Sequence, residues 1–362
     1  MRIFSILGGH GKDRAGGKDI IMEIKQSNET KISKKITIDD VAEALGVSKT
    51  TVSRAISGKG RIGIETKERV LEYIKEHNYK PNVIAKGLAQ SRTYNIGIVM
   101  PEDYNLIDLP FFQACLMGVC NMASGMDYDV LISVVSENDI SQLERIIANN
   151  KVDGVILTRT FVKDIAVEYL KEKKIPFVTV GSTTDDEVIQ VDNNHLEACK
   201  ELTSLLLMLG MKRIALIGGK DTHIVTKNRL QGYLDAYESK DLPVNNELIY
   251  MNSYNRTLIE KSVEDIIQRE VDCIICMDDM ICEYVLRKLK KEQIAVPKDI
   301  KVASFYNSAL LEHNRPSITS LQFDILKLGS RACKTLIDCI EGREIKKKQL
   351  LEYEIVLKES TK

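Results

Sequence analysis

The chain has 362 residues, 44% of them hydrophobic, with 51 Lys and Arg against 52 Asp and Glu. That length predicts about two to three domains, and the balanced charge excludes a uniformly basic nucleic-acid-binding protein. No apolar run reaches the roughly 18–20 residues that a membrane span needs. The apolar run after Arg2 is too short for a signal peptide, so we expect a cytoplasmic protein whose eight scattered cysteines stay reduced.

Residues 1–35 are rich in Gly, Lys, Asp and Ser. The segment Gly8–Gly17 looks superficially like a phosphate-binding loop, but no GxxxxGK[ST] register fits it. We expect a disordered extension or an over-long translation start, with Met22 as an alternative start. A functional tail is the other interpretation.

The stretch Thr37–Ser57 predicts two short helices joined by a tight turn. Apolar residues recur at helical spacing in its first half, at Ile38, Val41, Ala42 and Leu45. Thr37 is placed to cap the first helix, Gly46 to end it, and Ser48 to cap a second helix over Lys49–Ser57. A third helix is expected over 66–77, with Val70, Leu71 and Ile74 facing a small core.

The second of these helices presents a polar face made of Lys49, Thr50, Thr51, Ser53 and Arg54. No acidic residue occurs from Ser48 to Ile64, whereas Lys59 and Arg61 add further cations. Such a helix suits insertion into the major groove of DNA. The alternative is a helical hairpin whose polar face is merely solvated.

The segment 81–89 predicts a helix of about two turns, with Asn82 as its N-cap. It contains Gly87 and is too short to be stable alone in water. It is either a frayed linker or a helix that forms only when docked.

These motifs resemble the headpiece of the lac-repressor/galactose-repressor (LacI) family of bacterial transcription regulators. The matching residues are Thr37–Ala42, Gly46–Ser48, Thr51–Arg54 and Tyr79–Asn82. The resemblance implies four segments: the extension 1–35, a helix-turn-helix headpiece 36–80, a hinge helix and linker 81–93, and an effector-binding and dimerisation core 94–362. It also implies DNA contacts from Thr37, Ser48, Lys49, Thr50, Thr51, Ser53, Arg54, Arg61, Tyr79, Asn82, Ala85 and Leu88. Leu88 would wedge into the minor groove at the centre of a pseudo-palindromic operator.

From Tyr94 onward the pattern alternates between short β-branched runs and helical periods. Strands are predicted at 96–100, 129–134, 154–157, 176–180, 188–191, 213–217, 248–251, 273–276 and 301–304. Helices are predicted at 111–126, 141–149, 162–173, 195–209, 228–239, 258–269 and 280–291, with another inside 320–342 and a last strand over 350–358. This order predicts an α/β core of two lobes with parallel sheets, resembling periplasmic binding proteins. No leucine heptad follows, so a homodimer is expected rather than a tetramer.

Ligands of such folds bind beyond the carboxyl ends of the strands. The resemblance implies effector contacts from Phe111, Asp192, Arg229 and Asp278. Asp279 is interpreted as the N-cap of the following helix, and Arg229 has an ion pair between lobes as its alternative role. Tyr306 stands where some relatives have a carboxylate, which predicts a more aromatic site.

No catalytic residue is predicted, because the sequence lacks a nucleophile elbow, a phosphate loop and a recognisable triad. Cys273 and Cys276 have CxxC spacing, but they lie in a strand-like run without a second pair, so neither a metal nor a cofactor is expected. The sequence therefore indicates a DNA-binding regulator and not an enzyme. We expect it to repress carbohydrate-use genes under the control of a bound small molecule such as a sugar. The alternative is a cytosolic sugar-binding protein that recognises no operator.

Overall fold

The computed structural model describes residues 36–58, 60–80, 87, 90–102 and 110–362. The chain divides into two units, Met1–Lys86 and Gly87–Lys362, which are described separately. None of the helices in these ranges is long and apolar enough to cross a membrane.

The first unit contains the helices α2 (Ile38–Leu45), α3 (Lys49–Ser57) and α4 (Ile64–Glu76). Thr37 and Asp40 form a reciprocal capping box on α2, and Gly46 ends that helix with φ 64°. Ser48 caps α3 through the backbone N–H of Thr51. The predicted ends of α2 and α3 are therefore confirmed. The third helix begins at Ile64, two residues before the predicted start.

A small apolar core holds these three helices together. Its buried members come from every helix and from the segment after α4, namely Val41, Ala42, Val52, Ala55, Val70 and Tyr79. The prediction that Leu71 faces this core is wrong, because Leu71 is exposed and Tyr73 packs against the core instead. From a core of this size we expect a marginally stable headpiece.

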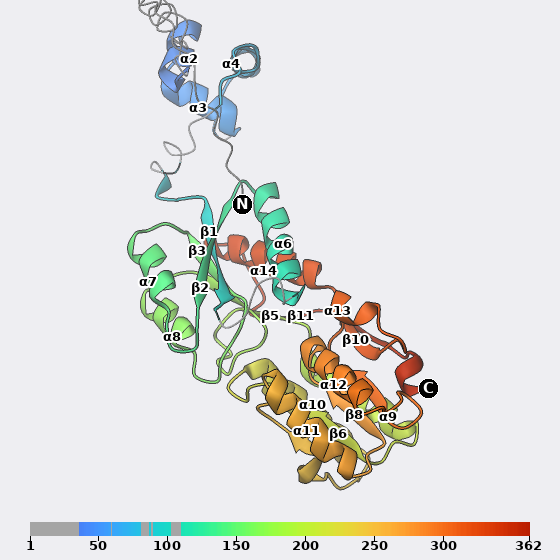
Figure 1. The fold of residues 1–362 in the computed structure, drawn as a ribbon. Helices are drawn as coiled ribbons and strands as arrows, with labels where there is room; N and C mark the ends of the chain where they lie inside the picture. The colour runs from blue at the N-terminus through green and yellow to red at the C-terminus, as the bar shows by residue number, and fades with distance from the viewer. Residues whose placement is uncertain (1–35, 59, 81–86, 88–89, 103–109) are drawn as a thin grey trace, which may run out of the picture. The chain divides into compact units, whose positions relative to one another are not determined.

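The first lobe of the second unit is built on a six-stranded sheet of order β11-β5-β4-β3-β1-β2, with every pair parallel. Its strands are β1 (Asn95–Pro101), β2 (Asp129–Val135), β3 (Gly154–Leu157), β4 (Phe177–Val180), β5 (Gln190–Asp192) and β11 (Lys348–Leu350). The helices α6 (Pro110–Gly125) and α14 (Ile325–Ile340) cover one face. The helices α7 (Ser141–Ala148) and α8 (Ile165–Glu172) cover the other (Figure 1).

The second lobe repeats this plan with the order β12-β10-β9-β8-β6-β7, in which only β10 and β12 pair antiparallel. Its strands are β6 (Ile214–Ile217), β7 (Ile249–Tyr250), β8 (Cys273–Cys276), β9 (Lys301–Ser304), β10 (Thr319–Phe323) and β12 (Tyr353–Val356). The main helices are α9 (His195–Met208), α10 (Ile224–Glu238), α11 (Arg256–Gln268) and α12 (Asp279–Lys291). The short helices α13 (Ala309–Glu312), η2 (Asn246–Leu248) and η3 (Glu359–Thr361) complete the lobe.

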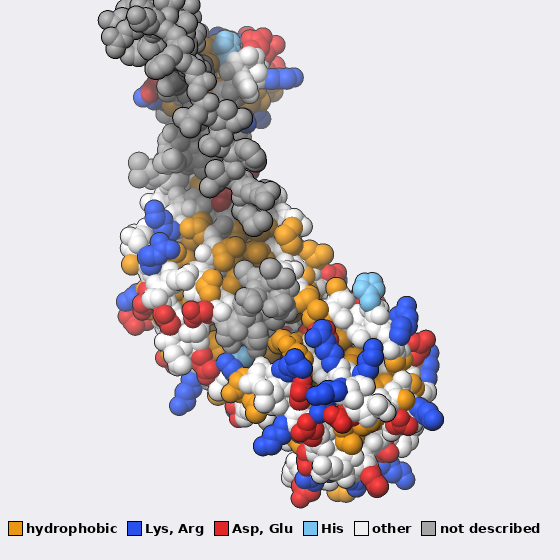
Figure 2. Space-filling view, viewed as in Figure 1, with side chains coloured by type: hydrophobic (Ala, Val, Ile, Leu, Met, Phe, Trp, Pro, Cys, Tyr) orange, Lys and Arg blue, Asp and Glu red, His pale blue; other side chains and the backbone are white. Residues whose placement is uncertain are grey.

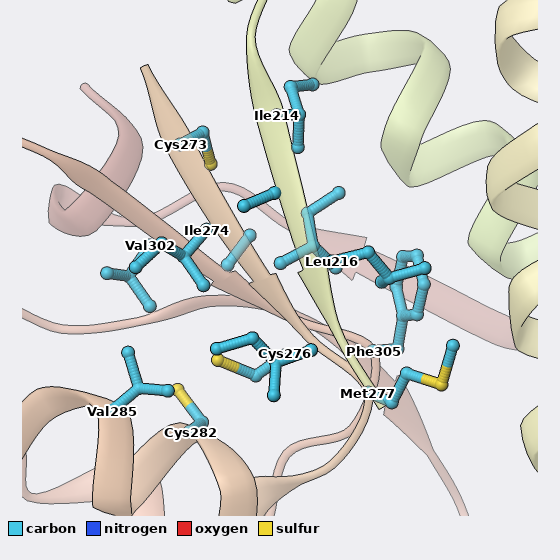
Figure 3. Close-up of a cluster of buried hydrophobic side chains, with 14 of the residues drawn as sticks. Ile214, Leu216, Cys273, Ile274, Cys276, Met277, Cys282, Val285, Val302 and Phe305 are labelled. Atoms are coloured by element: carbon cyan, nitrogen blue, oxygen red, sulfur yellow. The ribbon is translucent and has the colours of Figure 1, made fainter. Parts of the chain in front are cut away.

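The core of the second lobe explains the cysteine spacing. Cys273 and Cys276 lie on β8 and Cys282 on α12, packed among Ile214, Leu216 and Val302 (Figure 3). Each of the eight cysteines is a free thiol, and burial raises the pKa of the Cys273 thiol. No cluster of three or more metal-ligating side chains occurs within the described ranges. The CxxC pair is thus part of the apolar packing.

The chain crosses between the lobes three times, and two predictions change at these crossings. The predicted helix within 320–342 is preceded by a strand, β10, so Ser320–Phe323 is extended and the helix begins at Ile325. The predicted last strand over 350–358 is two strands, β11 in the first sheet and β12 in the second. Alternating residues fit one strand as well as two, so the sequence pattern could not reveal the break.

Two glycines allow α6 and α14 to pack closely in the first lobe. A Cβ on Gly118 would lie 2.2 Å from the backbone oxygen of Leu326, and a Cβ on Gly329 would lie 2.2 Å from that of Cys115. Ser330 adds a hydrogen bond from its hydroxyl to the Gly118 carbonyl at 3.0 Å. The backbones therefore approach to a distance that no larger residue permits at these two positions.

Candidate functional sites in the headpiece and the interlobe cleft

The polar face of α3 is exposed as predicted. Thr50, Ser53 and Arg54 are all solvent-accessible. Lys49 forms an ion pair with Asp39 on α2, and both side chains are exposed. A surface pair of this kind contributes little to stability, so Lys49 can exchange Asp39 for another anion at low cost.

Several hydroxyl groups predicted to contact DNA already have partners within the headpiece. The Thr37 hydroxyl donates to Asp40 at 2.7 Å, and the hydroxyls of Ser48 and Thr51 lie 2.9 Å apart. Because a hydroxyl has one donor and two acceptor positions, these groups retain capacity for a further bond.

The remaining predicted DNA contacts fall into three groups. Arg61 is exposed, whereas the Tyr79 ring is buried in the headpiece core and burial raises its pKa. Asn82, Ala85 and Leu88 lie outside the described residues.

A cleft of about 400 Å³ lies between the two lobes of the core. All five residues predicted to contact an effector line it, although they are widely spaced in sequence: Phe111, Asp192, Arg229, Asp278 and Tyr306. The volume falls within the range of about 300–1,000 Å³ that is usual for small-molecule sites. The fold therefore brings the predicted residues together in one cavity.

Arg229, on α10, is the principal buried cation of this cleft. Its side chain is only 9% exposed, and its Nη1 donates to the backbone oxygen of Met277 at 2.6 Å. Among the described residues, its buried Nε has no hydrogen-bond partner. An unsatisfied buried donor is costly, so this nitrogen is suited to bond a ligand oxygen.

Three carboxyl groups share the cleft with Arg229. Burial raises the pKa of Asp192 and of Asp278, and the nearby Arg229 guanidinium partly offsets both effects. Burial together with the neighbouring Asp278 raises the pKa of Asp279 to about 6. The three acids are thus held in surroundings that penalise their charged forms.

The capping role assigned to Asp279 belongs to its neighbour Asp278. Asp278 is the N-cap of α12 and accepts the backbone N–H of Ile281 at 2.8 Å. Asp279 is the first residue of the helix and is hydrogen-bonded to the Ser308 hydroxyl. The interpretation of Asp279 as the cap was therefore wrong by one position, and both residues line the cleft.

Aromatic rings form part of the cleft wall. The Phe111 centroid lies 6.0 Å from that of Tyr306 in an edge-to-face arrangement, and Tyr306 stacks on Phe323 at 6.4 Å. Phe112 packs edge-on against Phe111 at 5.0 Å. This row favours a ligand with apolar as well as polar surface.

Sequence reasoning missed several residues of the cleft. His195 begins α9, where its Nε2 lies 3.9 Å from Asp192 Oδ1, and burial lowers its pKa well below the ordinary value. Tyr254 and Tyr284 line the cleft from the loop before α11 and from α12. Only the position of His195 at the start of the predicted helix 195–209, three residues after Asp192, could have suggested a role in the site.

The two lobes are also bonded directly to each other. The backbone N–H of Val162 donates to the backbone oxygen of Thr222 at 2.9 Å, and that of Ile224 donates to the backbone oxygen of Thr160 at 3.2 Å. Asn228 adds a side-chain bond to the Ser182 hydroxyl at 2.6 Å. These bonds join the first lobe to the second lobe beside the cleft.

The chain is similar over nearly its whole length to known transcription regulators. Residues 37–82 match the bacterial regulatory proteins of the lacI family, and residues 203–361 match the periplasmic binding protein-like domain. The HTH-type transcriptional regulator MalR of Streptococcus pneumoniae is 32% identical over 89% of this chain and 99% of its own length. Catabolite control protein A of Staphylococcus xylosus is 28% identical over 86% of this chain and 94% of its own length.

Solved structures agree with this relationship. The transcriptional regulator CelR in complex with cellobiose is 27% identical, with a TM-score of 0.68 over 90% of this chain and 99% of its own. A lac repressor dimer bound to operator and an anti-inducer shares the fold, with a TM-score of 0.73 over 91% of this chain and 99% of its own at 20% identity. The helix-turn-helix headpiece, the two-sheet core and these similarities establish that the chain is a DNA-binding transcription regulator of the LacI family.

Proposed function

We propose that this regulator is a homodimeric repressor of carbohydrate-use genes, and that a sugar bound in the interlobe cleft controls its affinity for a pseudo-palindromic operator. The observation that carries the proposal is the convergence of Phe111, Asp192, Arg229, Asp278 and Tyr306 on one cleft. Carboxylates and a guanidinium each make paired, directed hydrogen bonds, which suits a ligand rich in hydroxyl groups.

In the headpiece, Lys49, Thr50 and Arg54 would read base edges in the major groove. Thr37, Ser48, Thr51, Ser53, Arg61 and Tyr79 would position the phosphates. Tyr79 would do so only through the small part of its side chain that the core leaves exposed. From the sequence, Asn82, Ala85 and Leu88 would fold at the operator centre, with Leu88 as an apolar wedge.

Dimerisation would double these contacts, and the core carries a surface that fits it. Met117 on α6 is 53% exposed and Leu326 on α14 is 49% exposed, and the backbone of Leu326 adjoins Gly118. Figure 2 shows hydrophobic side chains gathered on the face of the first lobe. Apolar surface of this kind supports a contact between protomers.

The ligand would act by changing the angle between the lobes. Bonds from Val162 and Ile224 join the lobes in this structure, so a ligand that favours another angle works against them. A relative supports a sugar as the ligand class, because CelR was solved with cellobiose. Ligand and DNA are then coupled through one equilibrium between lobe angles.

Fluorescence anisotropy of the purified protein tests this proposal. The probes are a library of pseudo-palindromic duplexes with a central CG step and a scrambled duplex, at two salt concentrations, with and without a panel of sugars. Selective binding that one sugar shifts is the expected result. Weak and equal binding to both duplexes that depends wholly on salt would indicate phosphate attraction alone and would contradict the proposal.

A further inference from the structure

We infer that the ligand contains at least two linked sugar rings, an inference that rests on the proposed sugar effector. One ring occupies the buried polar end of the cleft. The next stacks at the cleft mouth against Tyr254 and Tyr284. The two ends of the same cavity differ in exposure and in the kind of side chain that lines them.

The inner end is formed by side chains that are almost completely buried. Arg229, Asp192, His195 and Asp279 supply its polar groups, each of them less than 10% exposed. Two of these side chains carry a buried nitrogen with no partner among the described residues, Arg229 Nε and His195 Nδ1. Unsatisfied groups of this kind fit the hydroxyl groups of one sugar ring.

The outer end is aromatic and open. Tyr254 is 45% exposed although it lines the cleft, and Tyr284, which lines the cleft from α12, is half-buried. The Lys220 Nζ lies 5.6 Å from the Tyr254 ring centroid, which holds the ring at the rim of the cavity. Aromatic rings offer large, rigid contact surfaces at low entropy cost, and the C–H face of a sugar ring complements them.

The continuity of the cavity connects these two ends. Arg229 and Tyr254 line the same cleft of about 400 Å³, which reaches from the buried arginine to the exposed ring. Tyr254 stays 45% exposed at the rim of this cavity, so its ring still has apolar surface to bury. A ligand whose second ring reaches from the Arg229 end to the rim would bury more apolar area than one confined to the inner end.

Two cations of the outer end, Arg256 and Lys220, already have partners within the protein. Arg256 Nε donates to Glu260 at 2.5 Å, and Lys220 lies over the Tyr254 ring. A phosphate on a single ring would have to draw both away from these partners. The geometry therefore favours a neutral second ring over a phosphorylated single ring.

Isothermal titration calorimetry of the full chain tests the inference with glucose, glucose 6-phosphate, maltose and cellobiose. We expect at least one disaccharide to bind more tightly than glucose by about tenfold or more. Tyr254→Ala should weaken disaccharide binding by about three- to tenfold, the loss of one aromatic contact, and should leave glucose binding within about twofold.

Tyr169→Ala is the matched control. Tyr169 has a lysine, Lys173, at the same 5.6 Å from its ring but does not line the cleft. That variant should bind every sugar as the wild type does.

The outcomes separate this inference from the proposed function. Glucose binding as tight as any disaccharide, with Tyr254→Ala unchanged, would overturn the two-ring ligand and leave a sugar effector in place. Selective binding of glucose 6-phosphate would overturn it in favour of an anionic ligand. Failure of all four sugars to bind would contradict the sugar effector and this inference together.

Discussion

Arg229 donates from Nη1 to the backbone oxygen of Met277 at 2.6 Å, directly before Asp278 in the chain. This bond fixes one arm of the guanidinium to the end of β8, where Asp278 caps α12. The buried Nε keeps no partner among the described residues. Arg229 is thus held in place by one hydrogen bond while a second donor is left for a ligand.

Replacing Arg229 with Ala should abolish the response to the effector while leaving ligand-free DNA affinity nearly intact. The variant loses a charge-assisted hydrogen bond to the ligand. Such a bond contributes about 1.5–3 kcal/mol to the free energy of binding, or about ten- to a hundredfold in affinity. Sugar titration by calorimetry and operator titration by anisotropy measure the two effects separately. If both affinities fall together, the bond to Met277 is the main role of Arg229 and its role is structural.

The raised pKa of Asp279 predicts a dependence of stability on pH. Its carboxyl titrates at about 6, above its ordinary value of 3.8, so the folded protein binds the proton more tightly than the unfolded chain does. The free energy of unfolding should therefore fall as the pH rises from about 4 to about 6, by on the order of 2–3 kcal/mol from this group. Asp279→Asn has no proton to lose and should remove that fall.

Chemical denaturation between pH 4.5 and 7.5 measures this difference. His195 contributes with the opposite sign, because its lowered pKa costs stability as the pH falls below about 6.5. That contribution is present in both proteins and cancels in the comparison. Parallel curves for wild type and Asp279→Asn would mean that the Asp279 carboxyl is charged throughout this range.

Arg54→Ala tests the DNA-reading face of α3. Loss of one base-contacting arginine should weaken specific binding by about 1–3 kcal/mol and relax specificity at one position of the operator. Lys75→Ala removes a cation from the exposed end of α4 and serves as the control, since it should change specific binding little. A uniform loss on specific and scrambled duplexes would instead assign Arg54 to a phosphate.

The sequence predicted the elements whose pattern is local. Capping residues and apolar spacing gave α2, α3 and most of the strands to within a residue or two, because caps and periodicity are encoded by neighbours in the chain. Gly46, for example, was expected to end α2 and does so in the left-handed region.

The features that could not be predicted from the sequence depend on tertiary contacts. Leu205 and Leu209 share the spacing of buried Leu202 and Leu206, yet Leu205 is half-buried, and Leu209, the C-cap residue of α9, is exposed. The lining of the cleft also could not be predicted completely from the sequence. The five effector residues came from family resemblance, whereas His195, Tyr254 and Tyr284 join them only through the packing of two lobes.

Gly329→Ala should destabilise the core. A Cβ at this position meets the backbone oxygen of Cys115 at 2.2 Å, so α6 and α14 would have to separate, at a cost of about 1–3 kcal/mol. Gly125→Ala, at the end of α6, is the matched control because an added Cβ meets nothing within 4 Å there. Thermal unfolding that drops equally in both variants would attribute the loss to something other than the helix crossing.

The exposed apolar residues of α6 and α14 give a prediction for assembly. Leu326→Glu places a charge within the surface formed with Met117, and burying an unpaired charge between protomers is strongly unfavourable. We expect the variant to sediment as a monomer, to bind operator at least about tenfold more weakly because only one headpiece is engaged at a time, and to bind sugar as the wild type does.

Met208→Glu adds the same charge at an exposed methionine on α9 in the other lobe and should leave assembly and operator binding unchanged. A dimeric Leu326→Glu protein would place the contact between protomers elsewhere on the core, whereas a monomer that still binds operator at full strength would separate dimerisation from DNA recognition.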